Sequence, residues 1–392
     1  MDPVQLLVVG GFLGAGKTTL LAQAARRLVA LGKRVGLVTN DQADNLVDTA
    51  VLRAATGAGV REVSGGCFCC NFNELLSATD ELIRTYQPDV IISEPVGSCT
   101  DLSATVLQPL KKHHGRQFRV APFSVLVDVR QMRTLDQLWQ VYQDDATRRF
   151  PDEVLYIYRK QLEEADLIVL NKVDLVPEDQ AALLERVLAE HFPAAGRMAI
   201  SAKTGRGVDR WIQYVIQDGS GGGHLAEMDY DTYARGEAAL AWLNASVRLK
   251  SPTPQVWDVF CRGLLAAIRD QCRESNAAVA HIKIHLSCPA GTVTANLTDQ
   301  DDVPAARGQA DVRSETAELL INARVVTDPQ QLRGIVQRCL EQVAGATMAV
   351  EMESVASFAP PRPVPAHRFD SFDTSSSRTG GTWRPRFPKS DA

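Results

Sequence analysis

Short apolar runs alternate with amphipathic stretches over the first half of the chain. Seven runs are mostly apolar on successive residues: QLLVVG (5–10), RVGLVTN (34–40), GVREVS (59–64), DVIISE (89–94), FSVLVDV (123–129), DLIVLN (166–171) and RMAIS (197–201). Such runs are typical of parallel strands that are covered on both faces. Stretches between them, such as TTLLAQAARRLVALG and EDQAALLERVLAEHF, have helical periodicity. The alternation predicts a doubly wound α/β domain over residues 1–217, with a mostly parallel sheet.

The pattern changes at the glycine-rich segment DGSGGGHLAEMD, which predicts a flexible linker over residues 218–235. Beyond it the order is strand, helix, three strands, helix and strand. This order predicts a smaller α+β domain over residues 236–357, with its helices on one face of a mostly antiparallel sheet. From Ala359 the chain is rich in Pro, Ser, Thr and Arg and poor in aliphatic residues, so we expect a disordered tail over residues 358–392.

A glycine-rich loop lies between the first strand and the first helix. Its sequence, GFLGAGKT, has the spacing G-x4-G-K-[ST]. The glycines let backbone N–H groups turn toward an anion, and the helix N-terminus adds its positive dipole end. Lys17 can reach the outer phosphates of a nucleotide, and the Thr18 hydroxyl can ligate Mg²⁺. The predicted phosphate-binding residues are Gly11, Gly14, Ala15, Gly16, Lys17, Thr18 and Thr19.

An acidic residue ends the fourth apolar run. In IISEPVG, residues 91–97, Glu94 comes at the end of the predicted strand, where its carboxylate would face the phosphates. We predict that the Glu94 carboxylate contacts the magnesium ion directly or through an intervening group. We also predict that Gly97 lets the chain pass close to the γ-phosphate. Lys17 and Glu94 are therefore candidate catalytic residues.

Two later strand ends carry motifs that indicate which base is selected. NKVD, residues 171–174, contributes an Asp carboxylate that can accept two hydrogen bonds from guanine, which adenine cannot offer. SAKTG, residues 201–205, ends the next strand and suits a backbone contact to the base. In register with the glycine-rich loop, these motifs favour GTP over ATP. The candidate base-binding residues are Asn171, Lys172, Asp174, Ser201, Ala202 and Lys203.

Three thiols lie within four residues in the stretch SGGCFCCNF: Cys67, Cys69 and Cys70. A disulfide framework, a buried apolar cluster and a metal site are the alternatives. The N-terminus has no basic signal-peptide start and no apolar run is long enough to span a bilayer, so we expect a cytoplasmic protein, where a disulfide scaffold is not expected. A tight cysteine cluster in that compartment favours a site for a soft or borderline metal ion. The five other cysteines are interpreted as small buried hydrophobic residues.

Composition excludes some partners and fits a globular protein. Of 392 residues, 45% are hydrophobic and 23% are charged, which is enough apolar material for a sizeable core. The net charge of −5 gives no electrostatic reason to expect nucleic acid or an anionic membrane as a partner.

Taken together, these motifs resemble those of the CobW-type metallochaperone GTPases, P-loop GTPases that are relatives of HypB and UreG. The resemblance covers residues 4–217 and rests on GGFLGAGKTT, a switch segment VTNDQADNLVD, GGCFCC, EPVG and NKVD. It implies GTP hydrolysis with Mg²⁺, coupled to transfer of Zn²⁺ or Co²⁺ from Cys67, Cys69 and Cys70 to a metal-requiring client protein or cofactor pathway. It leaves open whether the protein is a homodimer.

The chain departs from the family pattern in three places. Asp41 stands where the family commonly has Glu, and Ala43 where it has Gly. The segment EPVGSCTDL replaces the more usual ESSGLADP, and the linker carries only His224 in place of a His-rich tract. Asp41 keeps a carboxylate, so the resemblance makes it a candidate for a catalytic or metal-binding role.

The sequence leaves two residue roles open. The fourth metal ligand is Asp41, a water molecule or one of the pair His113–His114, and the residue that orients the attacking water is Asp41, Asp48 or Glu94. We expect GTP to order the Asp41 segment and the cysteine loop, and hydrolysis to release the metal. Two alternatives are a regulatory GTP-binding module that senses metal or redox state without delivery, and an accessory GTPase of corrinoid metabolism.

Overall fold

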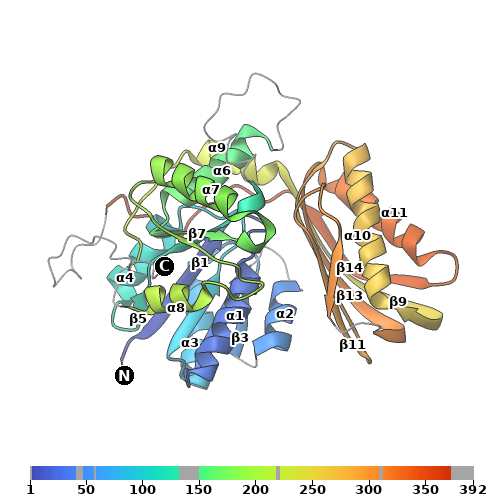
Figure 1. Ribbon diagram of the computed structural model, residues 1–392, viewed down its shortest axis with the longest axis horizontal. Helices are drawn as coiled ribbons and strands as arrows, with labels where there is room; N and C mark the ends of the chain where they lie inside the picture. The colour runs from blue at the N-terminus through green and yellow to red at the C-terminus, as the bar shows by residue number, and fades with distance from the viewer. Residues whose placement is uncertain are drawn as a thin grey trace.

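The computed structural model describes residues 2–40, 47–56, 59–131, 150–217, 221–308 and 312–371. They form two domains that lie side by side (Figure 1). The first has a parallel sheet with helices on both faces, and the second has an antiparallel sheet with two long helices on one face. The fold class predicted from the sequence is confirmed. Among the described residues, no helix combines the length and the apolar character needed to cross a bilayer.

The N-terminal sheet contains eight parallel strands among the described residues. Their order is β3-β2-β4-β1-β6-β7-β8, with β5 beside β1. The strands are β1 (Val4–Gly11), β2 (Val35–Asn40), β3 (Gly59–Val63), β4 (Val90–Glu94), β5 (Phe118–Val120), β6 (Ser124–Asp128), β7 (Leu167–Asn171) and β8 (Gly196–Ala199). Every residue of β2, β4, β6 and β7 is buried, as expected for strands covered on both faces. Only β5 was not predicted, because three residues are too few to give a pattern.

Helices connect these strands and cover both faces of the sheet. They are α1 (Lys17–Ala30), α2 (Val47–Thr56), α3 (Phe72–Tyr86), α4 (Gln108–His114), α6 (Asp152–Glu163), α7 (Glu178–His191) and α8 (Val208–Ile216), with short turns η1 (Ser103–Leu107), η2 (Val129–Gln131) and η4 (Val173–Leu175). Because all the strands run the same way, the loops that follow β1, β2, β3, β4 and β7 emerge at one edge of the sheet. Ligands of doubly wound sheets bind at this edge.

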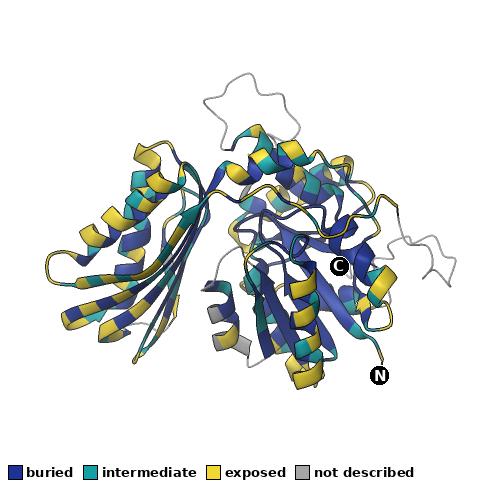
Figure 2. Ribbon diagram, turned by 180° about the vertical axis from the view of Figure 1, so that it is seen from behind, coloured by how far each residue is buried: buried dark blue, intermediate teal, exposed yellow. Residues whose placement is uncertain are grey.

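The second domain contains a six-stranded antiparallel sheet of order β12-β11-β10-β13-β9-β14. Its strands are β9 (Leu240–Val256), β10 (Ala278–Cys288), β11 (Gly291–Leu297), β12 (Ala305–Gly308), β13 (Arg313–Val326) and β14 (Ala349–Phe358). Helices α10 (Trp257–Glu274) and α11 (Pro329–Ala344) pack on one face, and α9 (Tyr230–Ala238) precedes the sheet. The other face of the sheet is turned toward the N-terminal domain (Figures 1 and 2).

Alternation along β10 shows how one strand serves both faces. Ile282, Ile284 and Leu286 are buried in the core beneath the helices. Their neighbours His281 and Lys283 instead line a cleft that faces the N-terminal domain. A period of two along a strand produces this division.

The described residues of the glycine-rich connection pack against the N-terminal domain. Gly222 and Gly223 donate backbone hydrogen bonds of 2.6 and 2.7 Å to the carboxylate of Asp166. A Cβ atom on Gly221 would lie 1.8 Å from the carbonyl oxygen of Ala121, so only glycine fits there. Residues 230–235, within the range predicted to be a linker, belong to α9. The flexibility predicted from the glycine run therefore does not apply to residues 221–235.

The first part of the predicted tail also follows a defined course. After β14 ends, residues 359–371 have neither helix nor strand and return to the N-terminal domain. We call this segment the strap. Backbone N–H groups of Ala366 and Phe369 donate to the carbonyl oxygens of Cys69 and Ala104, at 2.8 and 3.0 Å. The guanidinium of Arg368 pairs with the buried carboxylate of Asp101 at 2.9 Å. These contacts hold a segment whose composition alone predicts disorder.

Candidate functional site

The glycine-rich loop joins β1 to α1 at the ligand-binding edge of the sheet. Gly16 caps α1 in the left-handed conformation, with φ of 97°. A Cβ atom there would lie 2.4 Å from the side-chain nitrogen of Asn171, so glycine is required for both conformation and space. Lys17 is 6% exposed, and its ammonium donates 2.7 Å to the carbonyl oxygen of Gly11, so its side chain curls back over the loop. Burial lowers the pKa of Lys17 to about 8, against the opposing effect of the Glu94 carboxyl group.

Three oxygen-bearing side chains meet at the start of α1. The Thr18 hydroxyl lies 2.5 Å from Oδ1 of Asp48 and 3.0 Å from Oε1 of Glu94. Oε2 of Glu94 is buried and has no hydrogen-bond partner among the described residues. A hydroxyl and two carboxylates are the donors that a hard divalent cation prefers, and the unpaired oxygen leaves one donor free for it. This set fits Mg²⁺.

The two carboxyl groups of this set differ in acidity. Burial and, next, the neighbouring Asp48 carboxylate raise the pKa of Glu94 to about 7. Burial also acts on Asp48, but the Lys283 ammonium, together with Thr18 and Lys17, holds the pKa of Asp48 below its ordinary value. Asp48 is therefore the ionised partner, while Glu94 is partly protonated near neutral pH and is driven to ionise by added positive charge.

The base-selecting motifs lie beside the glycine-rich loop. The side-chain amide of Asn171 donates 2.8 Å to the carbonyl oxygen of Ala15 and accepts 2.9 Å from the backbone N–H of Ala202. Asn171 thus fixes the loop and the SAKTG turn together. The Ser201 hydroxyl donates 2.6 Å to Oδ1 of Asp174, an exposed residue of η4. Lys172 lies 2.5 Å from the buried carboxylate of Asp128, and Lys203 is exposed on the SAKTG turn.

The second domain forms the opposite wall of this site. The cleft is lined on one side by Gly14, Gly16, Lys17, Thr18, Thr19 and residues 94–97, and on the other by His281, Lys283, Thr294, Asn296, Asn322 and Arg324. The ammonium of Lys283 pairs with Oδ2 of Asp48. Asn322 accepts a 2.9 Å hydrogen bond from the backbone N–H of Val47, at the start of α2. No local sequence pattern predicts this contact, because the residues involved lie more than two hundred positions apart.

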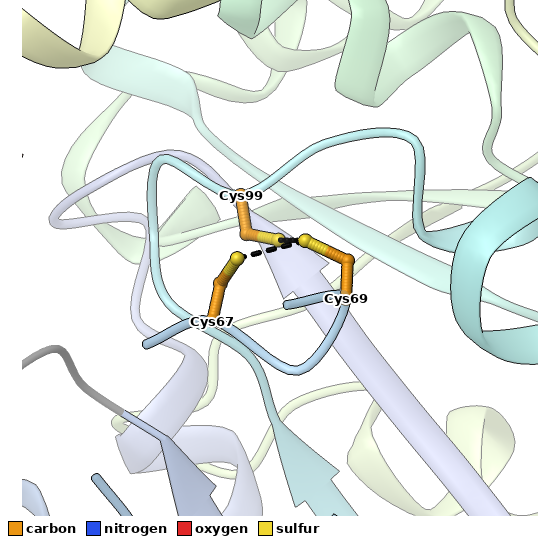
Figure 3. Close-up of side chains that lie close together, drawn as sticks. All are labelled: Cys67, Cys69 and Cys99. Atoms are coloured by element: carbon orange, nitrogen blue, oxygen red, sulfur yellow. Dashed lines mark hydrogen bonds between the residues drawn. The ribbon is translucent and has the colours of Figure 1, made fainter. Parts of the chain in front are cut away.

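Four thiols gather where the loops after β3 and β4 meet, and Figure 3 shows three of them, Cys67, Cys69 and Cys99. The sulfur atoms of Cys67, Cys69 and Cys99 all lie within 4.8 Å of one another. Cys67 and Cys69 are 2.7 Å apart, and Cys69 and Cys99 are 3.8 Å apart. All three are buried, with exposed fractions of 6%, 2% and 2%. Cys70 is only partly buried, with its sulfur 3.3 Å from that of Cys67 and 3.8 Å from that of Cys69.

Asn40, the last residue of β2, organises the cysteine loop. Its amide group donates to the carbonyl oxygens of Val63 and Gly66, at 3.0 and 2.7 Å, and accepts 2.9 Å from the backbone N–H of Phe68. Asn40 also lines the cleft described above. We call the glycine-rich loop with Thr18, Asp48 and Glu94 the phosphate side of the sheet edge, and the four-thiol cluster its thiol side. The Asn40 side chain therefore contacts both sides.

Hydrogen bonds within the cluster give its thiols different acidities. The Cys67 and Cys69 thiols donate toward Cys99 and lower the pKa of Cys99 to about 6. Interaction with Cys67 raises the pKa of Cys70 to about 11, and hydrogen bonding to its neighbours also raises the pKa of Cys69. Several thiolates this close repel one another, so full ionisation requires a bound cation.

Cys99 is the functional candidate that the sequence interpretation missed, since it was assigned to the core as a small hydrophobic residue. Cys99 lies in the short loop that follows Glu94 at the end of β4. Because loops after parallel strands emerge at one edge of the sheet, this position could have predicted that Cys99 lies near the cysteine loop. The pair His113–His114 instead lies against Phe72 and strap residues, with ring centroids 6.3 Å apart for His114 and Phe72. No histidine belongs to the thiol group within the described ranges. Asp41 lies outside the described residues.

Comparison with known proteins agrees with the sequence motifs. Residues 5–196 match the family model described as "CobW/HypB/UreG, nucleotide-binding domain". The zinc chaperone CobW of a Sinorhizobium species is 32% identical over 197 residues, which cover 43% of this chain and 51% of that protein. The zinc chaperone YeiR of Escherichia coli K12 is 30% identical over 185 residues, or 45% of this chain and 49% of that protein. The chain thus spans about half the length of the curated relatives it matches.

Among solved structures, HypB from Helicobacter pylori in complex with nickel is 19% identical to this chain, with a TM-score of 0.38. The aligned region covers 55% of this chain and 86% of the HypB chain. At that score the likeness adds nothing to what the strands and helices themselves establish.

Proposed function

We propose that this protein is a GTP-hydrolysing zinc chaperone, on the premise that residues 5–196 match the family model "CobW/HypB/UreG, nucleotide-binding domain". In this proposal the glycine-rich loop binds the phosphates of GTP, and Thr18, Asp48 and Glu94 hold Mg²⁺. The thiol cluster binds Zn²⁺ as cargo and passes it to a client protein. Zinc is favoured over cobalt because the curated relatives named above are zinc chaperones and because thiolates suit Zn²⁺.

The observation that carries the proposal is that two elements contact both sites. Asn40 lines the cleft and binds the backbone of the cysteine loop through three hydrogen bonds. The segment after β4 lines the cleft with residues 94–97 and, two residues later, places Cys99 in the thiol cluster. A shift of either element in response to the γ-phosphate would therefore change the spacing of the thiols.

The residues at the phosphate side suit phosphoryl transfer. Lys17 holds a buried ammonium beside the loop that would surround the β- and γ-phosphates, and Lys283 adds a second positive charge from the facing sheet. Fixed positive charge in a site shielded from water stabilises the charge that develops on a transferring phosphoryl group. When bound, Mg²⁺ would add positive charge between Thr18, Asp48 and Glu94. Asp174 and the SAKTG turn would select guanine.

One observation favours a rival function. Cys67, Cys69 and Cys99 are buried, and the strap crosses the loop that carries Cys67 and Cys69. A closed site of this kind suits a regulatory GTP-binding module that retains its metal as a sensor. A chaperone must open the cluster when GTP is hydrolysed, whereas a sensor need not.

Transfer of metal separates the two functions. The zinc-loaded full chain would be mixed with a zinc-sensitive dye and Mg²⁺, and dye response followed after addition of GTP or a non-hydrolysable GTP analogue. We expect zinc release only with GTP, at a rate that matches hydrolysis. A chain that hydrolyses GTP and keeps its zinc would be the sensor.

The metal itself needs a separate measurement. Protein purified with GTP and Mg²⁺ would be analysed for metal content after growth with zinc and cobalt supplied together. We expect zinc in about equimolar amount. Cobalt in its place would favour an accessory role in corrinoid metabolism.

A further inference from the structure

The sulfur of Cys99 comes from a different strand-end loop than the other three thiols. It lies thirty positions from Cys69 in the chain, yet the two sulfur atoms are 3.8 Å apart. Zn–S bonds of about 2.3 Å in tetrahedral geometry place neighbouring sulfurs about 3.8 Å apart. The Cys69–Cys99 pair has this separation, and so does the Cys69–Cys70 pair, so the loop after β4 supplies a thiol as well placed as those of the C-x-C-C stretch.

Cys70 differs from Cys99 in its surroundings. It is half-buried, while Cys99 is 2% exposed. Its sulfur accepts a 3.3 Å hydrogen bond from the backbone N–H of Val364 in the strap. The group of side chains that could hold a metal ion contains Cys67, Cys69 and Cys99, although the sulfur of Cys70 also lies 3.3 and 3.8 Å from those of Cys67 and Cys69. Cys70 is thus turned to the strap side of the cluster.

We propose that Cys67, Cys69 and Cys99 are the main thiolate ligands of the metal, and that Cys70 lies outside this set. The inference rests on the proposed function and deepens it by changing which residues hold the metal. Three protein thiolates leave the fourth position of a tetrahedral ion for an exchangeable ligand, which a site that hands its ion to another protein needs. In a site made of adjacent C-x-C-C thiols alone, this link to the β4 loop would be absent.

The loop that carries Cys99 is anchored in a way that suits a ligand under conformational control. The side-chain amide of Gln161 in α6 donates to the carbonyl oxygens of Gly97 and Cys99, at 3.0 and 2.9 Å. The Ser98 hydroxyl donates 3.1 Å to the carboxyl group of Glu237 in α9. A Cβ atom on Gly97 would lie 3.1 Å from the ammonium of Lys17. The same loop therefore passes the phosphate-binding lysine and ends at the metal ligand.

Cobalt titration of the full chain under anaerobic, reducing conditions tests the assignment. Co²⁺ reports thiolate ligands through charge-transfer absorption, and competition with Zn²⁺ gives the zinc affinity. The variants are Cys99→Ser and Cys70→Ser, with Cys99→Ala as a packing control. Cys261→Ser is the matched control, because Cys261 is a buried cysteine of the second domain.

We expect Cys99→Ser and Cys99→Ala to weaken metal affinity at least thirtyfold and to lower the charge-transfer absorption by about a third. Cys70→Ser is expected to stay within about threefold of the wild-type affinity, and Cys261→Ser to match the wild type. The proposal is overturned if the Cys99 variants bind Co²⁺ as the wild type does, or if Cys70→Ser loses more affinity than Cys99→Ser.

A second measurement keeps the test decisive if the Cys99 variants fail to fold. A zinc-edge anomalous map of wild-type crystals grown with Zn²⁺ identifies the sulfur atoms around the ion directly. We expect Cys99 among them, and an ion bound by Cys67, Cys69 and Cys70 alone would overturn the inference. If the wild type binds neither Co²⁺ nor Zn²⁺, the proposed function itself fails, which is a different outcome.

Discussion

The phosphate side and the thiol side share one edge of one sheet, but they are built on opposite principles. The phosphate side buries charged groups: Lys17 and Glu94 are 6% and 5% exposed, and one oxygen of Glu94 has no partner among the described residues. It opens into a cleft that the second domain completes. The thiol side holds sulfur groups that hydrogen-bond to one another, and the strap crosses it.

This difference indicates how the two sides would behave. Buried charges without full compensation favour a ligand that brings opposite charge, so the phosphate side is suited to bind and exchange nucleotide. A closed cluster exchanges its ion slowly unless neighbouring segments move. Nucleotide binding and hydrolysis at the phosphate side would then control metal release at the thiol side.

The largest effect should come from Lys17→Ala, which breaks the phosphate side alone. Loss of its ammonium removes stabilisation of the transferring phosphoryl group, and we expect kcat for GTP hydrolysis to fall about 10²- to 10³-fold. Zinc affinity without nucleotide should stay within twofold of the wild type. Steady-state hydrolysis and zinc competition measure the two, with the exposed Lys33→Ala as control. Equal losses in both would show that the sides are not separable.

Glu164→Gln tests how the thiol side is held. Glu164 is fully buried and contacts the loop after Cys99 through the Thr100 hydroxyl and the backbone N–H of Ser103, at 3.0 and 2.8 Å. Burial raises the pKa of Glu164 to about 8, so this side chain binds a proton in the folded state that it loses in the unfolded state above about pH 4.5. The wild type therefore loses stability from Glu164 as pH rises from about 4.5 to 8.

Glutamine reproduces the protonated form of Glu164 and does not titrate. We expect Glu164→Gln to exceed the wild type in free energy of unfolding by about 4 kcal/mol at pH 8, with the difference falling below about 1 kcal/mol near pH 5. Denaturant unfolding across this range measures it. A difference that is constant with pH would contradict the assignment of a neutral acid at this position.

Lys283→Ala tests whether the second domain takes part in the phosphate side. The ammonium of Lys283 pairs with Asp48 in the cleft, so its removal takes away positive charge near the phosphates. We expect kcat/KM for GTP to fall about tenfold, which corresponds to about 1.4 kcal/mol. Lys250→Ala, an exposed position on the same sheet, is the control. Unchanged kinetics would confine the phosphate side to the N-terminal domain.

Arg368→Ala should give the smallest effect, and it acts on the strap. Arg368 is partly exposed, but its partner Asp101 is 1% exposed, so the ion pair fixes the strap to a buried carboxylate. We expect zinc dissociation to speed up about threefold, in line with the modest free energy of a partly exposed ion pair. Stopped-flow release to a chelator measures it. Arg362→Ala, which removes an exposed ion pair with Asp231, should leave the rate unchanged.

That the phosphate-side residues lie together could be predicted from the sequence, because their pattern is local. Gly11 to Thr19 run without a break from the end of β1 into the first turn of α1, and Glu94 and Asn171 each end an apolar strand, so strand direction alone brings them to one edge. The fold class follows from the same periodicity, and the unpredicted strands β5 and β12 have only three and four residues.

The thiol side could be predicted only in part because its contacts are not local. The close spacing of Cys67, Cys69 and Cys70 predicts a metal site from the sequence alone. Cys99 has no such signal, because its proximity to the other thiols depends on how the loops after β3 and β4 meet in the fold. The strap is harder still, since its composition predicts disorder and only long-range contacts such as Arg368 with Asp101 hold it. Docking of β10 over α2, through Lys283 and Asp48, likewise has no local signal.

The central claim is that occupation of the phosphate side changes the thiol side. Zinc affinity of the full chain, measured by competition with Mg²⁺ present, would be compared between a non-hydrolysable GTP analogue and GDP. The account predicts at least tenfold tighter zinc binding with the GTP analogue, and by linkage an equal effect of zinc on the preference for the analogue over GDP. Equal zinc affinity in the two nucleotide states would contradict it.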